Sequence, residues 1–456
     1  MIHTENNWTT TNNHFPLLDP EVRRYVSVLP SQRQLRHAEK PFYLFMHFGM
    51  NTATGREWGN AAESVEDFTI RHIDPKQWVD AAEICGASGI ILTCKHHDGF
   101  CLWDTQTTDF NVMRTGLQTD VVAALSAECR RRQIDFGVYL SPWDMHEPCY
   151  ATPAYNDFFC AQLTELLTRY GPIFEVWFDG AKGKDAKAFS YDWERYYQLV
   201  RSLQPDACIS ICGPDLRWVG NEGGRCRNSE FSVVPEALTK AEAIKEHSQQ
   251  TPEQAKELKK LTSRDEDLGS RDILKQHEAL VWYPAEVDVS IRRGWFHPGG
   301  GKVKSAKRLM RIYLHAVGNN CALLLNVPPD KNGRIDSADL RSLTQFGEMI
   351  RAVTAHPICA AHPGKLSEHD GALSFDLPSD EPVRYCILAE DIAHGQRVEK
   401  FDLYLLNKHN RCTFVYHGTV IGSKKIIPVG KKAARAILVI RQSRSTPILQ
   451  SVGFYA

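Results

Sequence analysis

The sequence lacks an excess of charge of either sign. Its 456 residues include 54 Lys and Arg against 55 Asp and Glu, which leaves a formal net charge of -1. A chain so balanced has no long-range field with which to attract a polyanion or an acidic membrane surface. We therefore expect an uncharged substrate and no nucleic-acid partner.

Long apolar runs are also missing. No stretch approaches the ~20 uninterrupted apolar residues of a membrane-spanning helix. The first residues, MIHTENNWTTTNNHF, have no basic patch followed by an apolar core, as a signal peptide would. We expect a soluble protein without a membrane span. It is cytoplasmic by default, or periplasmic or secreted if a signal peptide has been removed.

The sequence has few signs of metal or disulfide chemistry. Its thirteen cysteines are an odd number, many stand inside apolar runs, and no CxxC pair recurs at a zinc-like spacing. Such thiols are typical of small core side chains rather than of a disulfide scaffold, which favours a reducing compartment. We expect no cofactor and no structural metal.

Apolar, strand-like runs alternate with helix-like segments through most of the chain. The runs span residues 42–49, 89–97, 135–141, 174–180, 208–214, 287–292 and 321–329. Several segments between them begin at Pro, Asp or Asn and end at Gly or before Pro, as helices do. The pattern predicts an α/β fold, a TIM-like (β/α)8 barrel over residues 1–355. A doubly wound open sheet is the alternative, although no Gly-rich dinucleotide fingerprint follows the first strand.

The last hundred residues have a different sequence pattern. Short β-rich runs such as VRYCILAE and RAILVIRQS are separated by Gly, Asp, Asn and Pro. We expect residues 356–456 to form an antiparallel β-sandwich that supports the barrel or binds weakly. The charged, apolar-poor segment 234–278 is expected to be a solvated helix or a mobile insertion.

Polar residues follow several predicted strands, at the end where barrel active sites lie: His47, His96, His97, Tyr139 and Asp179. Asp179 ends FEVWFDG and precedes a glycine, so it is the best candidate for a reactive carboxylate. Alternatively, it only caps a helix or holds an arginine. His47 with His96 or His97 and Asp179 would also make a metal triad. Neutral imidazoles suit the hydroxyls of an uncharged sugar equally, which agrees better with the charge balance.

Acid–base cleavage of a glycosidic bond needs a second carboxyl group. The later candidates are Asp215, Glu222, Glu230, Glu286 and Asp288. Glu222 stands in GPDLRWVGNEGG, after a tryptophan and before two glycines, in a loop suited to carry a side chain over the barrel mouth. Glu57 beside Trp58 in GREWGN is typical of a ligand clamp, because indole rings stack on the C–H faces of sugars.

Eight segments together resemble the α-L-fucosidases of glycoside hydrolase family 29. They are FMHFG, GREWGN, ILTCKHHDGFCLW, FGVYLSPWD, GPIFEVWFDGA, GPDLRWVGNEGG, YPAEVDVSIRRGWF and LLLNVPP, in order over residues 40–330. GPDLRWVGNE and PAEVDVSIR are most similar to the branch that acts on α-1,3- and α-1,4-fucosyl linkages in branched glycans. The resemblance implies a barrel followed by a β-sandwich, a retaining mechanism, and a fucosylated oligosaccharide or glycoconjugate as substrate.

The resemblance also implies roles for individual residues. The family's nucleophile falls on Asp179, and the general acid/base of the similar branch falls on Glu222. Fucose-contacting positions fall on His47, Glu57, Trp58, His96, His97, Tyr139 and Trp295. Glu286 and Asp288 match a motif of that branch and are assigned a substrate-side role. A metal-dependent barrel hydrolase, a glycosidase for another sugar and a non-catalytic sugar-binding protein remain as alternatives.

Overall fold

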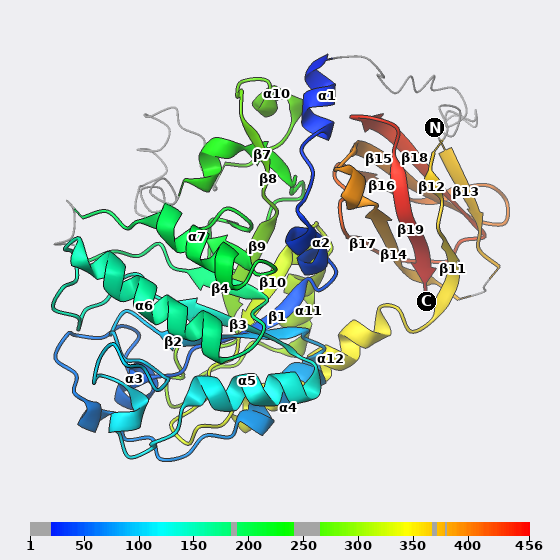
Figure 1. Cartoon of the computed structure of the whole chain (residues 1–456). Helices are drawn as coiled ribbons and strands as arrows, with labels where there is room; N and C mark the ends of the chain where they lie inside the picture. The colour runs from blue at the N-terminus through cyan, green and yellow to red at the C-terminus, as the bar shows by residue number, and fades with distance from the viewer. Residues whose placement is uncertain (1–19, 184–188, 241–264, 367–371, 379–380) are drawn as a thin grey trace.

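The structure, a computed structural model, describes residues 20–183, 189–240, 265–366, 372–378 and 381–456. A parallel barrel sheet with surrounding helices occupies one side of the molecule, and two antiparallel sheets occupy the other (Figure 1). Among the described residues, no helix is long and apolar enough to cross a membrane.

Eight parallel strands form the barrel sheet, in the order β5-β4-β3-β2-β1-β10-β9-β6. Their bounds are β1 Phe42–Met46, β2 Gly89–Lys95, β3 Asp135–Leu140, β4 Glu175–Phe178, β5 Cys208–Ile211, β6 Arg217–Trp218, β9 Ala285–Ser290 and β10 Ala322–Asn326. An isolated bridge between Ser210 and Leu216 joins the two ends of this order, so the sheet is nearly closed. The predicted barrel is therefore confirmed, and the doubly wound open sheet is not formed.

Burial on both faces explains why the barrel strands are continuously apolar. All residues of β1 and β2 are buried, because helices cover the outside of the sheet and side chains fill its interior. Phe45, Tyr139 and Trp177 pack inside, with ring centroids 5.2 to 5.7 Å apart. The interior of the barrel is a packed core. Its side chains nearest the carboxyl ends of the strands form the floor of the site described below.

Capping residues set the starts of the main helices around the barrel. The Asp74 side chain accepts from the Gln77 N–H at the start of α4, which has Pro75 in its first turn, and Asp120 and Asp192 cap α5 and α7 in the same way. The α-helices are α1 Pro20–Val26, α2 Gln32–Ala38, α3 Met50–Thr54, α4 Pro75–Cys85, α5 Val121–Arg132, α6 Ala154–Arg169, α7 Trp193–Leu203, α10 Arg271–Leu274, α11 Ala306–Ala316 and α12 Ser337–Ala352. The 3-10 turns are η1 Val65–Asp67, η2 Val112–Arg114, η3 Glu236–Thr239 and η4 Ile392–His394.

The charged segment 234–278 is described only at its two ends. Residues 241–264 lie outside the described residues, so the expected solvated helix or insertion is not tested there. At the flanks, β7 Val233–Pro235 pairs antiparallel with β8 Leu280–Trp282. This pair packs against α1 through Tyr25, above the barrel in the view of Figure 1.

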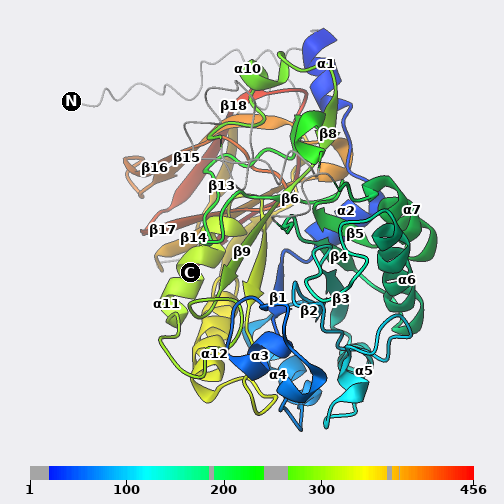
Figure 2. The same ribbon diagram turned by 90° about the vertical axis from the view of Figure 1, so that its left-hand side faces the viewer.

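Two antiparallel sheets follow the barrel, as predicted for the C-terminal part. One has the order β11-β19-β14-β17, with β12 also paired to β19, and the other has the order β13-β18-β15-β16. Their strands are β11 Pro357–Ala361, β12 Gly364–Lys365, β13 Ala372–Asp376, β14 Val383–Glu390, β15 Val398–Leu406, β16 Cys412–Gly418, β17 Lys425–Lys431, β18 Arg435–Ser443 and β19 Ile448–Tyr455. Inward side chains of both sheets, such as Leu388 and Leu403, form one core. Figure 2 shows the two sheets from the side.

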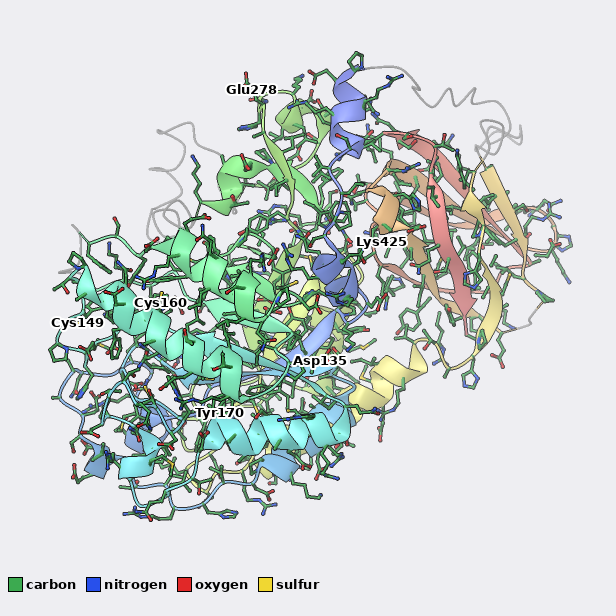
Figure 3. The ribbon with its side chains drawn as sticks, viewed as in Figure 1. Asp135, Cys149, Cys160, Tyr170, Glu278 and Lys425 are labelled. Atoms are coloured by element: carbon green, nitrogen blue, oxygen red, sulfur yellow. The ribbon has the colours of Figure 1, made fainter. Side chains whose placement is uncertain are left out.

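Polar contacts hold the sandwich against the segment that precedes β10. Lys425, at the start of β17, donates to Asn319 Oδ1 at 2.6 Å and lies between the two parts of the molecule (Figure 3). The Ser423 N–H donates to Asn320 Oδ1 at 2.8 Å. The sandwich is thus fixed to the barrel side that carries β9 and β10.

Candidate active site

A cavity of about 700 Å³ opens at the carboxyl ends of the barrel strands. Its wall brings together nine of the predicted site residues: His47, Trp58, His96, His97, Tyr139, Asp179, Glu222, Asp288 and Trp295. These side chains come from segments spread over almost 250 residues. Two further predicted residues, Glu57 and Glu286, are not part of the wall.

Asp179 follows β4 and is held by two donors. The Tyr139 hydroxyl donates to Asp179 Oδ2 at 3.0 Å, and the Ala181 N–H donates to Oδ1 at 2.7 Å. His97 Nε2 lies 3.8 Å from Oδ2, and the Asp179 side chain is 26% exposed. Among the described residues it forms no ion pair with an arginine, in contrast to the alternative that the sequence left open. The result is an oriented carboxylate on the cavity wall.

Three buried imidazoles stand beside this carboxylate. The His96 ring centroid lies 5.6 Å from that of His47 and 4.1 Å from that of His97. Burial lowers the pKa of His47 to about 3 and that of His96 well below its usual range. Burial also lowers the pKa of His97, although the charge of Asp179 opposes the shift. The rings are therefore neutral at pH 7, and each offers one donor and one acceptor.

Neighbouring groups orient two of these rings and leave a polar atom of the third unpaired. His47 Nδ1 lies 2.9 Å from Asn326 Oδ1, and the Asn326 amide donates to the Trp295 carbonyl at 2.8 Å. His97 Nδ1 lies 2.7 Å from Ser141 Oγ. His96 Nδ1 is buried without a hydrogen-bond partner among the described residues. Sequence reasoning missed Asn326, although this polar residue ends β10 and the strand-end argument applies to it.

Glu222 reaches the same cavity from the Glu222 loop, which we define as residues 219–230 after β6. Partial desolvation raises the pKa of Glu222, a hydrogen bond from Trp295 lowers it, and the nearby charge of Asp179 raises it. Gly224 in this loop has φ +70°, and a Cβ there would lie 3.0 Å from Ile312. Glycine is thus required where the chain turns back after Glu222.

Asp288 lines the cavity beneath the Glu222 loop. Its Oδ1 accepts a hydrogen bond from Trp218 Nε1 at 3.1 Å. Burial raises the pKa of Asp288 well above its usual range, and the charge of Glu222 adds to the shift.

Aromatic and aliphatic side chains complete the wall. Trp58 is 55% exposed, and its ring centroid lies 5.7 Å from that of His97. Phe45 and Ile211 add apolar surface, and sequence reasoning missed both. Ile211 has φ +65°, which is rare for a β-branched residue and marks local strain at the end of β5. No pattern in the sequence signals that conformation.

Glu57 and Glu286 lie outside the cavity wall, in two different surroundings. Glu57 Oε2 accepts a hydrogen bond from the Trp295 N–H at 2.7 Å, so this carboxylate helps to hold a residue of the cavity wall. Glu286 is fully buried in the barrel, where it accepts from Trp177 Nε1 at 2.8 Å and from the Tyr43 hydroxyl. Glu286 lies two residues before Asp288 on β9, about 7 Å nearer the amino end of the strand. Asp288 thus lines the cavity and Glu286 lies deeper in the barrel, and the substrate-side role of both stays a prediction.

The donor geometry does not assemble the metal triad that the sequence left open. Among the described residues, side chains close enough to share an ion form two groups, Cys226 with Glu230 and Cys321, and His37 with Glu175 and Glu286. Neither group includes a histidine of the cavity or Asp179. The histidines of the cavity are instead arranged as hydrogen-bonding groups.

A parallel barrel with three carboxyl groups, neutral histidines and tryptophans around one cavity at its carboxyl end is typical of a glycoside hydrolase. Comparisons with known proteins narrow this class.

A family model described as alpha-L-fucosidase matches residues 31–354. Alpha-L-fucosidase 1 of Arabidopsis thaliana is 33% identical over 94% of this chain and 87% of its own length. A crystal structure from Bacteroides ovatus is 40% identical, with a TM-score of 0.85 over 97% of this chain and 77% of that chain. A Ruminococcus gnavus family 29 fucosidase, solved in complex with fucose, is 26% identical, with a TM-score of 0.80 over 94% and 95%. The chain therefore belongs to the alpha-L-fucosidase family.

Proposed function

We propose that this fucosidase removes terminal α-1,3- or α-1,4-linked L-fucose from branched, Lewis-type glycans by a retaining, two-step mechanism. The observation that carries the proposal is the oriented carboxylate of Asp179 on the same cavity wall as Glu222. The linkage is supported by the resemblance of the GPDLRWVGNE and PAEVDVSIR segments to the branch that acts on these linkages. Glu222 and Asp288, which lie in these segments, line the cavity.

In the first step, an oxygen of Asp179 attacks the anomeric carbon, and the bond from that carbon to the leaving oxygen breaks. Glu222 gives its proton to the leaving oxygen. In the second step, Glu222 takes a proton from water while the water oxygen attacks the anomeric carbon and releases Asp179. Two inversions leave the configuration retained. The raised pKa of Glu222 suits the proton donor of the first step.

The remaining wall residues suit a neutral deoxy sugar. We assign hydrogen bonds to the fucose hydroxyls to the three histidines and to Tyr139, because these groups are uncharged and can both donate and accept. The C6 methyl group of fucose needs an apolar edge, which Phe45 and Ile211 supply. Trp58 and Trp295 are assigned to stack on the sugar or on the next residue of the glycan, with Trp295 held by Glu57.

The two parts of the chain divide the work in this proposal. Residues 1–355 form the catalytic domain, because every residue of the cavity wall lies in this range. Residues 356–456 act as a supporting sandwich, which contacts the segment before β10 through Lys425.

The test measures fucose release from a Lewis-type trisaccharide beside a 2′-fucosylated oligosaccharide, with proton NMR of the first product. The proposal expects faster release from the Lewis-type substrate and α-fucose as the first anomer. β-Fucose as the first anomer would overturn the retaining mechanism. Preference for the 2′-fucosylated substrate would contradict the proposed linkage preference. A faster reaction on an aryl glycoside with a C6 hydroxyl would contradict the proposed specificity for fucose.

A further inference from the structure

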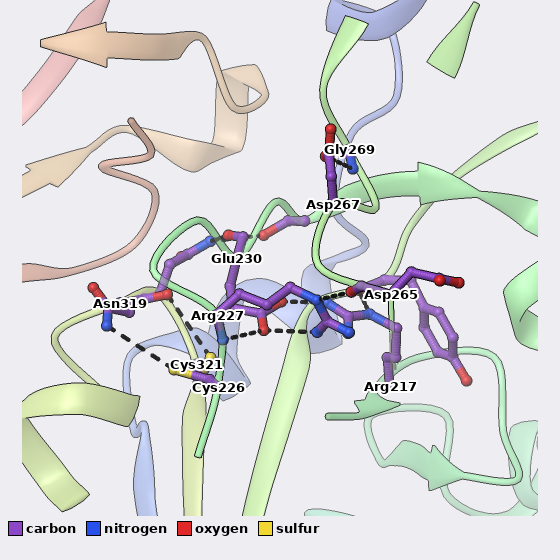
Figure 4. Close-up of polar contacts among 12 residues, drawn as sticks. Arg217, Cys226, Arg227, Glu230, Asp265, Asp267, Gly269, Asn319 and Cys321 are labelled. Carbon is purple, nitrogen blue, oxygen red and sulfur yellow. Dashed lines mark hydrogen bonds and ion pairs between the residues drawn. The ribbon is translucent and has the colours of Figure 1, made fainter. Parts of the chain in front are cut away.

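A second cluster of reactive side chains lies outside the cavity and has no part in the proposed mechanism. Cys226 Sγ lies 3.2 Å from His315 Nδ1 and 3.1 Å from the His315 carbonyl oxygen. The sulfur atoms of Cys226 and Cys321 lie within 4.8 Å of each other. Figure 4 shows the two cysteines side by side, one in the Glu222 loop and the other directly before β10.

The surroundings of Cys226 favour a thiolate. Hydrogen bonds from Cys321 and His315 lower the pKa of Cys226 to about 6, although burial opposes the shift. The same contact raises the pKa of His315. Glu230, Lys425 and Arg217 are further charged groups that act on the two sulfurs. A half-buried thiolate paired with a histidine is the setting in which cysteines react.

The remaining cysteines lack this setting. Burial raises the pKa of core thiols such as Cys85, to about 12. Cys412 is the exposed one of the thirteen, and its Sγ contacts the Phe414 carbonyl oxygen rather than a basic group. Cys226 therefore differs from the rest by its neighbours and not by its exposure.

The cluster is poorly suited to a metal ion, although Cys226, Glu230 and Cys321 are close enough to share one. Both Glu230 carboxylate oxygens are occupied, by Arg217 at 2.8 Å and by Arg227 at 2.8 Å. Only the two sulfurs remain as available ligands in this group, and the guanidinium groups would repel a cation. The arrangement favours chemistry between the two thiols.

The two segments are already bound to each other, so joining the sulfurs needs little movement. The Asn320 amide donates to the Glu230 carbonyl at 2.9 Å and to Ser232 Oγ at 3.1 Å. The Asn221 amide donates to the Arg225 carbonyl at 2.8 Å and closes the turn between Glu222 and Cys226. A bond at Cys226 would therefore fix the base of that turn.

We propose that Cys226 and Cys321 are an oxidisable pair, which hydrogen peroxide converts into a disulfide that ties the Glu222 loop to the segment before β10. The Cys226 thiolate attacks one peroxide oxygen, the O–O bond breaks, and the departing hydroxide takes a proton to give water. Cys321 then loses its proton and attacks the sulfenic sulfur of Cys226, whose hydroxyl leaves as a second water. Two thiols give two electrons to one peroxide. Any consequence for turnover rests on the proposed function, whereas the disulfide does not.

The test treats the full chain with hydrogen peroxide, blocks remaining thiols with N-ethylmaleimide and identifies linked peptides by mass spectrometry. We expect one major product in which the Cys226 and Cys321 peptides are joined with loss of two hydrogens, and which dithiothreitol reverses. Cys412→Ser keeps this product, whereas Cys226→Ser and Cys321→Ser lose it. Cys226 left as a thiol, joined to another cysteine or oxidised to a sulfinic acid without the link would overturn the proposal.

A second measurement needs no oxidant and no variant of the pair. Iodoacetamide at pH 6 should alkylate Cys226 about tenfold faster than Cys412, because the gain in thiolate fraction outweighs the lower nucleophilicity of a more acidic thiol. His315→Gln should remove most of this advantage. Equal rates for the two cysteines in the unsubstituted protein would overturn the proposal even if fucosidase activity is normal. Normal thiol chemistry without fucosidase activity would contradict only the proposed function.

Discussion

Two pairs of carboxyl groups occupy one barrel, and their surroundings differ completely. Glu175 and Glu286 lie in the packed interior, close enough to His37 to share an ion, and Glu175 accepts from Ser210 Oγ at 2.6 Å. Asp179 and Glu222 lie on the cavity wall. Glu175 and Asp179 belong to one chain segment and point to the same side of it, four residues or about 13 Å apart. Height along the strand therefore decides whether a carboxyl group supports the fold or faces a ligand.

Burial also shifts the pKa values of the interior group. It raises the pKa of Glu175 to about 7 and that of Glu286 well above its usual range. It lowers the pKa of His37 to about 4. At neutral pH the carboxyl groups of the interior therefore carry protons, and these protons form hydrogen bonds within the group. The cavity pair keeps one carboxyl group as an acceptor of two hydrogen bonds, Asp179, and a second with a raised pKa, Glu222.

Replacement of Asp179 should have the largest effect on activity. We expect Asp179→Ala to lower kcat on an aryl α-L-fucoside by at least about 10⁴-fold, because the attacking oxygen is lost. The melting temperature should change little, since the side chain faces the cavity. Asp179→Asn serves as the matched control for charge. A kcat close to that of the unsubstituted enzyme would remove Asp179 from the mechanism.

Replacement of Glu222 should separate two kinds of substrate. Glu222→Ala is expected to lower kcat on a Lewis-type glycan by about 10²–10⁴-fold. The loss on an aryl fucoside should be much smaller, because its leaving group needs little protonation. Asn221→Ala, at the neighbouring wall position, controls for disturbance of the Glu222 loop. Equal losses on both substrates would contradict the acid role.

Replacement of Glu286 should affect stability instead of chemistry. Glu286→Ala leaves the Trp177 and Tyr43 donors unpaired inside the barrel, so we expect the free energy of unfolding to fall by about 2–4 kcal/mol. Urea unfolding measures the change, and Glu286→Gln should recover part of it. The folded fraction should keep its kcat. A stable Glu286→Ala enzyme with a large loss of kcat would instead place Glu286 in the catalytic machinery.

Most of the fold could be predicted from the sequence because long buried strands and capped helices leave clear patterns. Seven of the eight barrel strands coincide with predicted runs. The eighth, β6, consists of Arg217 and Trp218 alone, which is too short for any periodicity to reveal. In the sandwich, β11, β12 and β19 have no clear β-rich pattern in the sequence. β11 and β12 are short, and β19 carries mixed polar and apolar residues.

The end of the barrel that carries the site was also predictable, but the residue of each strand that reaches the cavity was not. Polar residues at strand ends led to Asp179, His47 and Tyr139, all of which line the cavity. A matching motif cannot say whether residue i or residue i+2 of a strand reaches the cavity, and so it named Glu286 and Asp288 together, of which Asp288 lines the cavity. Ile211 was missed because its unusual backbone conformation depends on the loop that follows and leaves no trace in residue type.

The smallest expected effect tests the protonation of the interior pair. The pKa of Glu175 is about 7 in the folded protein, whereas an unfolded glutamate has a pKa of about 4.3. Between these two pH values Glu175 is protonated in the folded protein and ionised in the unfolded chain. This contribution to the free energy of unfolding is fully present below about pH 4.3 and is lost as the pH rises to about 7. Glu175→Gln cannot titrate and still accepts from Ser210.

We therefore expect the unsubstituted protein to lose stability relative to Glu175→Gln as the pH rises from 4.5 to 7.5. The loss in the free energy of unfolding should be up to about 3 kcal/mol. Urea titrations at four pH values in this range measure the shift. Glu278→Gln, at an exposed position (Figure 3), should show no such trend. A parallel course for the unsubstituted protein and Glu175→Gln would mean that Glu175 is ionised inside the barrel, and the contrast between the two carboxyl pairs would then be one of position alone.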